Sequence, residues 1–207
     1  MSPPSPRRST RRRSTKTSRR GPALAPGDFV FGLGSNLGER EAVLLGALAS
    51  LAAALGPLAV SSPYRSVALV AAGAGPQPDY LNAVAVGHAD LDPEALVALA
   101  KATERRAGRR RAPRWAARVL DIDLLLWGSI QRGDLELTLP HPRMRKRAFV
   151  LAPLAELLPD LPLPPDGATP LALLRAHTDA TPVARLDWSR PLPSSLTREV
   201  PCSSMPS

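Results

Sequence analysis

The chain has 207 residues, of which 44% are hydrophobic and 22% are charged, with 24 prolines and one cysteine. This length allows one domain with tails, and a domain of about 150 residues buries roughly two-thirds of its unfolded surface, which is enough for a core. The lone Cys202 excludes a disulfide framework and a cysteine-rich zinc site. No apolar run approaches the roughly 20 residues that span a bilayer, and no signal peptide is apparent, so we expect a cytoplasmic protein.

The net charge of +9 belongs to one end of the chain. Residues 1–27 hold eight basic side chains and no acidic one, which leaves 19 basic against 18 acidic residues elsewhere. This Ser-, Thr-, Pro- and Arg-rich stretch cannot bury enough surface to offset its ordering entropy, so we predict a disordered tail, and a second one over 191–207. Three roles stay open for the basic tail: a solvated extension, binding to nucleic acid or another anionic surface, and an organelle transit peptide.

The body of the chain, residues 28–190, alternates strand and helix patterns. One helix is predicted after Asn36, which resembles an N-cap with Glu39 three residues on, and it ends at Gly56-Pro57. Others are predicted from Asp92 to Gly108 and over 169–174. Apolar or alternating runs predict strands over 28–33, 60–64, 81–89, 119–127 and 183–188. The order β-α-β-β-α-β predicts an α+β fold, with a ferredoxin-like antiparallel sheet between two layers of helices.

Two carboxylates interrupt the apolar strand predicted over 119–127. Asp121 and Asp123 are two residues apart, so in a strand they point to one face, roughly 6–7 Å from each other. Carboxylates at this spacing suit a pair of Mg²⁺ ions of the kind used in phosphoryl transfer, about 3.5–4 Å apart. The alternative is a solvated strand face that carries two charges, and the residues alone leave both open.

A dense basic segment precedes this strand. Seven arginines fall within residues 105–118, where glycine and proline break any helix and favour a loop. Bidentate guanidinium groups beside a metal-binding carboxylate pair are what a polyphosphate substrate requires. A solvated basic loop or a nucleic-acid patch is the alternative.

Three further clusters are weaker when taken alone. Residues 32–38 form a glycine-rich turn between a strand and a helix, but they lack the P-loop lysine. Residues 77–82 place a tyrosine and an asparagine at the start of a strand, where they could meet a flat heterocycle; the alternative is a strand entry with the tyrosine in the core. In residues 140–149, a histidine between prolines precedes several arginines and suits either a structural turn or a phosphate contact.

Together these segments resemble the 6-hydroxymethyl-7,8-dihydropterin pyrophosphokinases, enzymes of folate biosynthesis. The resemblance extends from Phe29 to Trp188 and rests on four segments in a fixed order. These segments are Gly34-Ser35-Asn36, Gln77-Pro78-Asp79-Tyr80-Leu81-Asn82, Arg114-Trp115 with Arg118-Val119-Leu120-Asp121-Ile122-Asp123, and Pro140-His141-Pro142-Arg143-Met144 with Arg147-Ala148-Phe149. It implies that residues 28–190 form a catalytic domain that transfers diphosphate from ATP to the pterin's hydroxymethyl oxygen and releases AMP. A monomer is expected, with no membrane or nucleic-acid partner for the body.

The resemblance also implies roles for individual residues. Asp121 and Asp123 would hold two Mg²⁺ ions, with Arg109 and Arg118 as catalytic cations around the transferred group. Tyr80, Asn82 and Phe149 would bind the pterin. The residues implied for ATP are Glu104, Arg111, Trp115, His141 and Arg147, of which Arg111 and Trp115 belong to a lid. Positioning and electrostatics supply most of the acceleration in such transfers.

The chain departs from the family pattern at residues 66–76, where a Thr-Pro-x-Gly-like stretch that walls the pterin pocket is usual. The segment between Gly108 and Trp115 is also about one residue shorter than in some relatives. Two other interpretations stay open: an RNA-binding module, suggested by the ferredoxin-like core with a basic tail, and a catalytically inactive relative that serves as a scaffold, suggested by the altered 66–76 segment. The aromatic content of 4% and the Val- and Ala-rich strands count against the first, and the intact aspartate pair against the second.

Overall fold

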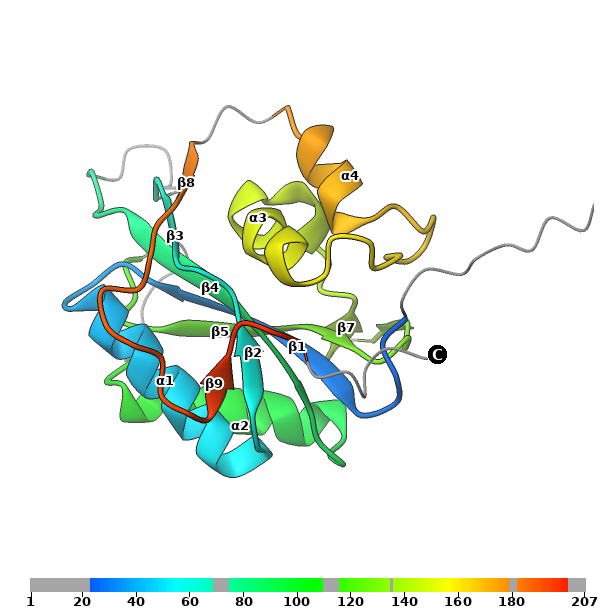
Figure 1. The fold of residues 1–207 in the computed structure, drawn as a ribbon, viewed down its shortest axis with the longest axis horizontal. Helices are drawn as coiled ribbons and strands as arrows, with labels where there is room; N and C mark the ends of the chain where they lie inside the picture. The colour runs from blue at the N-terminus through cyan, green and yellow to red at the C-terminus, as the bar shows by residue number, and fades with distance from the viewer. Residues whose placement is uncertain (1–22, 69–74, 110–115, 135, 179–181, 201–207) are drawn as a thin grey trace, which may run out of the picture.

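The computed structural model describes residues 23–68, 75–109, 116–134, 136–178 and 182–200. Its centre is a seven-stranded sheet, in which β5, β1, β4, β2 and β9 are neighbours in that order, while β3 pairs with β4 and β8. Helices α1 and α2 cover one face of the sheet, and α3 and α4 cover the other (Figure 1). The bounds are β1 Asp28–Ser35, α1 Arg40–Leu55, β2 Leu58–Val60, β3 Tyr64–Ser66, β4 Tyr80–His88, α2 Pro93–Arg106, β5 Asp121–Trp127, β6 Arg132–Gly133, β7 Thr138–Leu139, α3 Ala148–Leu157, α4 Pro170–Arg175, β8 Val183–Arg185 and β9 Leu196–Thr197, with a 3₁₀ turn at Met144–Lys146. This arrangement confirms the predicted ferredoxin-like α+β class.

Strand β1 lies at the centre of the site-bearing part of the sheet. It pairs antiparallel with β4 on one side and with β5 on the other. Its alternation sends Phe29, Phe31 and Leu33 into the core beneath α1 and α2, and Val30 into the core beneath α3. Side chains of β1 thus belong to both cores, and a shift of its register by one residue would exchange the side chains that point to the two faces of the sheet.

The helices begin and end close to where their patterns predict. Helix α2 starts after Asp92, whose side chain accepts a 2.7 Å hydrogen bond from the Ala95 amide, with Pro93 in the first turn. Helix α1 ends at Gly56, which adopts φ +89°, a left-handed conformation that favours glycine. Of the leucines at helical spacing in α1, Leu44, Leu48 and Leu51 are buried, and Leu55 at the end of the helix is half-buried.

Three parts of the fold differ from the expectation. The N-cap of α1 is Glu39 and makes no side-chain cap hydrogen bond, so Asn36 is not the cap that its spacing suggested. The strand predicted over 60–64 is two short strands, β2 and β3, which both pair with β4 but in registers that differ by one residue. At the break, the Ser61 hydroxyl accepts a 3.0 Å hydrogen bond from the Val84 amide of β4.

The third difference is a pair of elements that the patterns did not predict. Helix α3 contains Pro153 and an almost continuous apolar sequence, so it shows neither helical periodicity nor a polar face. Strand β9 lies within the stretch 191–207 that we expected to be loose, and it pairs parallel with β2. Leu196 of β9 is buried in the core and holds this segment against the sheet. The Pro- and Ser-rich composition of the stretch gave no indication of this single apolar contact.

Among the described helices, none combines the length and apolar character needed to cross a membrane. Residues 1–22 and 201–207 of the two predicted tails lie outside the described part of the chain.

Candidate active site

The two aspartates of β5 lie on one face of the sheet, at its border with β1. Asp121 pairs with Gly34 and Asp123 with Gly32, and both carboxylates line a pocket on the α3 side of the sheet. Their side chains are 28% and 38% exposed, so solvent reaches them. The residue between them, Ile122, points into the opposite core, as strand alternation requires.

The floor of the pocket is open because β1 carries glycine there. A Cβ at Gly34 would lie 3.3 Å from Asn82 Oδ1 and 3.5 Å from the Tyr80 ring, and one at Gly32 would lie 3.2 Å from the Leu125 side chain. Side chains at these positions would therefore fill space that the pocket needs. This is a physical reason for glycine at positions 32 and 34, which lie within strand β1 and not in the turn that the sequence pattern indicated.

Two aromatic side chains line the same pocket. Tyr80 opens β4, and Phe149 lies in the first turn of α3 on the opposite side. Burial, with the nearby Asp121 carboxylate second, raises the pKa of Tyr80, so its phenol keeps its proton at neutral pH. The structure thus brings together the two aromatic residues and the two aspartates from three segments of the sequence, β4, β5 and α3.

Asn82 lies on the same strand as Tyr80, two residues further on, and is buried. Its amide nitrogen donates to the Tyr64 carbonyl (3.1 Å) and to Ser66 Oγ (2.9 Å), both on β3. These bonds fix the orientation of the amide, with its oxygen toward Gly34.

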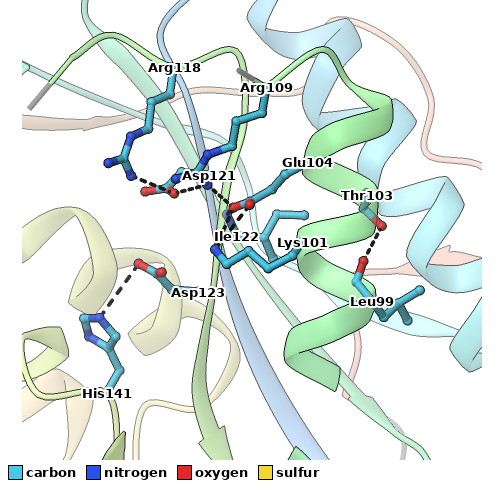
Figure 2. Close-up of polar contacts among 10 residues, drawn as sticks. All are labelled: Leu99, Lys101, Thr103, Glu104, Arg109, Arg118, Asp121, Ile122, Asp123 and His141. Carbon is cyan, nitrogen blue, oxygen red and sulfur yellow. Dashed lines mark hydrogen bonds and ion pairs between the residues drawn. The ribbon is translucent and has the colours of Figure 1, made fainter. Parts of the chain in front are cut away.

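Asp121 is held by two arginines (Figure 2). Its Oδ1 accepts from Arg109 Nη1 at 2.6 Å and from Arg118 Nη1 at 2.9 Å. The same Arg109 nitrogen also donates to Glu104. Arg109, Arg118 and Asp121 are each 22–28% exposed, so this cluster lies at the edge of the pocket and remains partly hydrated.

Glu104 lies behind this cluster and is buried, with a side chain only 2% exposed. It accepts a 2.7 Å hydrogen bond from the Ile122 amide, which lies between the two aspartates, and Lys101 Nζ approaches it to 3.2 Å (Figure 2). The described surroundings of Glu104 are therefore protein groups. A direct contact with ATP stays a prediction.

His141 faces the second aspartate, with Nε2 3.8 Å from Asp123 Oδ2. Burial lowers the pKa of His141, although the Asp123 carboxylate acts in the opposite sense, so the imidazole is neutral at pH 7. Its Nδ1 accepts from the Arg143 amide at 3.3 Å, which places the proton of the neutral ring on Nε2, toward Asp123.

Arg147 lies at the start of α3, with its guanidinium carbon 5.4 Å from the centre of the Phe149 ring. Burial lowers the pKa of Arg147, but the group stays cationic at any physiological pH. This cation–π contact links the basic end of the site to its aromatic wall.

The donor set suits a hard divalent cation. Within the described ranges, no three His, Cys, Asp or Glu side chains gather into a group that could hold a metal ion. Two carboxylates are nevertheless the protein contribution typical of Mg²⁺, which keeps several waters and binds substrate phosphates as well. Asp121 and Asp123 fit this chemistry.

Two predicted site residues, Arg111 and Trp115, lie outside the described part of the chain, as do residues 69–74 of the atypical 66–76 segment. One residue of the site carried no predicted role beyond a helix cap. Asn36 is buried and hydrogen-bonded to two segments that border the pocket, at Arg118 and at Gln77-Pro78. The only signal for it was its place in the Gly34-Ser35-Asn36 segment.

Comparison with known proteins identifies the family of this chain from its sequence. The profile of the 7,8-dihydro-6-hydroxymethylpterin-pyrophosphokinase (HPPK) family matches residues 30–159. A 2-amino-4-hydroxy-6-hydroxymethyldihydropteridine pyrophosphokinase from Synechocystis sp. is 40% identical over 169 residues, which cover 77% of this chain and 84% of that protein. The protein of the same name from Methylorubrum extorquens is 43% identical over 133 residues, covering 63% and 82%.

A solved structure shares the fold. The Plasmodium falciparum HPPK-DHPS wild type with pteroate superposes with a TM-score of 0.59 at 13% identity and covers 74% of this chain. This chain spans only 44% of that one. The profile match covers more than half of the chain, and the sequence relatives are matched over most of their length, so the chain belongs to the 7,8-dihydro-6-hydroxymethylpterin-pyrophosphokinase family.

Proposed function

We propose that this chain transfers diphosphate from ATP to the hydroxymethyl group of 6-hydroxymethyl-7,8-dihydropterin and releases AMP, a step of folate biosynthesis. The observation that carries the proposal is the pocket itself. Two carboxylates, Asp121 and Asp123, line it together with two aromatic side chains, Tyr80 and Phe149, while two arginines stand at its edge. A flat heterocycle and a polyphosphate are the two ligand classes that this combination suits.

On the pterin side, Tyr80 and Phe149 supply apolar faces for the ring. Because the Asn82 amide nitrogen is occupied by β3, its oxygen is the atom left to meet the donor edge of the heterocycle. The hydrogen bonds to Tyr64 and Ser66 hold that oxygen in place before the substrate arrives, which reduces the entropy lost on binding.

On the phosphate side, Arg109 and Arg118 carry the positive charge. In the transfer, negative charge spreads over the oxygens of the moving group, and pre-positioned guanidinium groups stabilise it without reorganising. His141 presents Nε2–H near Asp123 and would donate to a phosphate oxygen. Arg147 would add a cation beside Phe149, and Arg111 and Trp115 are expected to contribute to ATP binding.

Asp121 and Asp123 would hold two Mg²⁺ ions. When bound, such ions neutralise phosphate oxygens and orient the triphosphate for displacement. The expected cytoplasmic location and monomeric state stay predictions.

The test is an assay of AMP formation from ATP and Mg²⁺, with and without 6-hydroxymethyl-7,8-dihydropterin. AMP that forms only when the pterin is present would support both the reaction class and the acceptor. ADP in place of AMP would contradict diphosphate transfer and indicate a simple kinase. If the chain released neither nucleotide under any condition, the inactive-scaffold alternative would replace the proposal.

A further inference from the structure

The side chain of Asn36 joins two segments that are distant in the sequence. Asn36 follows β1 directly and is 1% exposed. Its Oδ1 accepts from the Arg118 amide at 2.7 Å, and its Nδ2 donates to Gln77 Oε1 at 3.2 Å and to the Pro78 carbonyl at 3.4 Å. The backbone N–H of Asn36 also donates to the Arg118 carbonyl at 3.1 Å. Both the N–H and the C=O of Arg118 are therefore hydrogen-bonded to this one residue.

The chemistry of the partners fixes the orientation of the side-chain amide of Asn36. The Arg118 backbone nitrogen can only donate, and the Pro78 carbonyl can only accept. The oxygen of Asn36 must therefore face Arg118, and its nitrogen must face Pro78. An aspartate would keep the first contact and lose the second, whereas an alanine would lose both.

Each segment leads directly into one half of the proposed site. The Arg118 guanidinium lies 2.9 Å from Asp121 Oδ1 on the phosphate side. Pro78 comes two residues before Tyr80, the first residue of β4 and an aromatic wall of the pocket. A single buried side chain thus connects the backbone of a phosphate-side arginine to the approach of the pterin-side strand.

We infer that Asn36 is a positioning residue for diphosphate transfer: it holds the Arg118 backbone and the approach to β4 at a fixed separation. The inference rests on the proposed function. Asn36 does not line the pocket in the described structure, so it acts through Arg118 and Tyr80 and has no substrate contact of its own. Fixing two reactants relative to each other is worth much in phosphoryl transfer, because positioning supplies a large part of the acceleration.

The test compares Asn36→Asp and Asn36→Ala with a matched control, Asp28→Ala. Asp28 is as buried as Asn36, lies at the other end of β1, and likewise joins two segments, through the Ala25 amide (2.7 Å) and His88 Nδ1 (3.0 Å). Melting temperatures are measured first, and kinetics are then compared below the lowest of them. The rate of amide hydrogen exchange at Arg118 is measured on the same proteins, because it does not depend on activity.

We expect Asp28→Ala to keep kcat and both KM values within about twofold of the wild type, since an interaction far from the pocket is removed. Asn36→Asp should raise the KM for the pterin about tenfold, as expected for one lost buried hydrogen bond, while it retains slow exchange at the Arg118 amide. Asn36→Ala should also lower kcat about tenfold or more and speed exchange at that amide at least tenfold.

The positioning role is overturned if both Asn36 variants match Asp28→Ala in kcat, in both KM values and in exchange at Arg118. A wild-type chain that forms no AMP would instead remove the proposed function. In that case the exchange measurement still decides whether Asn36 fixes the Arg118 backbone.

Discussion

Glu104 offers the clearest single test of how the site is held together. Its buried carboxylate accepts from the Ile122 amide and from Arg109, and Lys101 lies within 3.2 Å. Glu104→Gln keeps the shape but removes the charge, and it sets an amide N–H₂ group among donors. Hydrogen bonds to charged groups contribute about 1.5–3 kcal/mol each.

The magnitude must be discounted, because Arg109 is 22% and Lys101 44% exposed, and water partly screens both. We therefore expect a loss of about 2–3 kcal/mol in the free energy of unfolding, below the sum of the separate bonds. For a chain of this size, that corresponds to a melting temperature about 4–12 °C lower. Since one Arg109 nitrogen contacts both Glu104 and Asp121, the rate of AMP formation should fall as well.

The assay is thermal and urea unfolding, followed by AMP formation at a temperature where both proteins are folded. Glu94→Gln is the matched control, since it makes the same chemical change on the same helix, at an exposed pair with Arg132. Such surface pairs contribute about 0–1 kcal/mol, so this variant should stay close to the wild type. If Glu104→Gln and Glu94→Gln were equally stable within about 0.5 kcal/mol, the reasoning from burial and charge would be refuted.

Three other perturbations test separate parts of the molecule. Asp123→Ala should abolish AMP formation with little change in melting temperature, because it removes a solvent-accessible carboxylate and no core group; near-normal turnover would contradict the metal-binding role. Phe149→Ala should raise the KM for the pterin about tenfold or more, since stacking on an aromatic ring is worth roughly 1–3 kcal/mol per base, and an unchanged KM would place the pterin elsewhere. Burial acts to raise the pKa of Glu156, but hydrogen bonds from Ser62 and Tyr64 outweigh it and hold that pKa below its ordinary value of 4.5. The folded state therefore binds this proton less readily than the unfolded state. The loss of stability in Glu156→Gln, measured by urea unfolding, should be full at pH 7 and should shrink as the pH falls below 4.5. A loss that does not change with pH would exclude the ionised carboxylate as its cause.

The sequence was most informative where one periodicity dominated. The leucines of α1, the alternation of β4 and the cap at Asp92 each predict their element, because local propensity and burial agree there. The aspartate pair of β5 was noticeable for the opposite reason, since two charges in an apolar strand conflict with burial unless they have a function.

What sequence reasoning could not supply were the partners of polar groups. Asn36 has the spacing of a helix cap, but its amide is used by segments more than 40 and 80 positions away in the sequence. The family resemblance assigned Glu104 to the ATP site, but it did not indicate that the side chain is buried against β5, where it accepts from the Ile122 amide. Long-range hydrogen bonds leave no periodic signal, so only the fold reveals which polar side chain is structural and which faces the pocket.

The two aspartates of β5 are equivalent in sequence but not in the structure, and the difference bears on how the site accepts a charged substrate. Asp121 is paired with Arg109 and Arg118, while Asp123 is more exposed and faces a neutral His141 at 3.8 Å. Asp121 therefore keeps the two arginines beside the pocket before any polyphosphate arrives. In the proposed reaction, a triphosphate would offer those arginines replacement oxygens while Asp121 would hold Mg²⁺, so the ion pairs would be exchanged without leaving a charge unpaired. The two guanidinium groups are thus brought together when the chain folds and not when the substrate binds. Groups that are positioned in advance can stabilise the charge of a transition state without reorganising during the reaction.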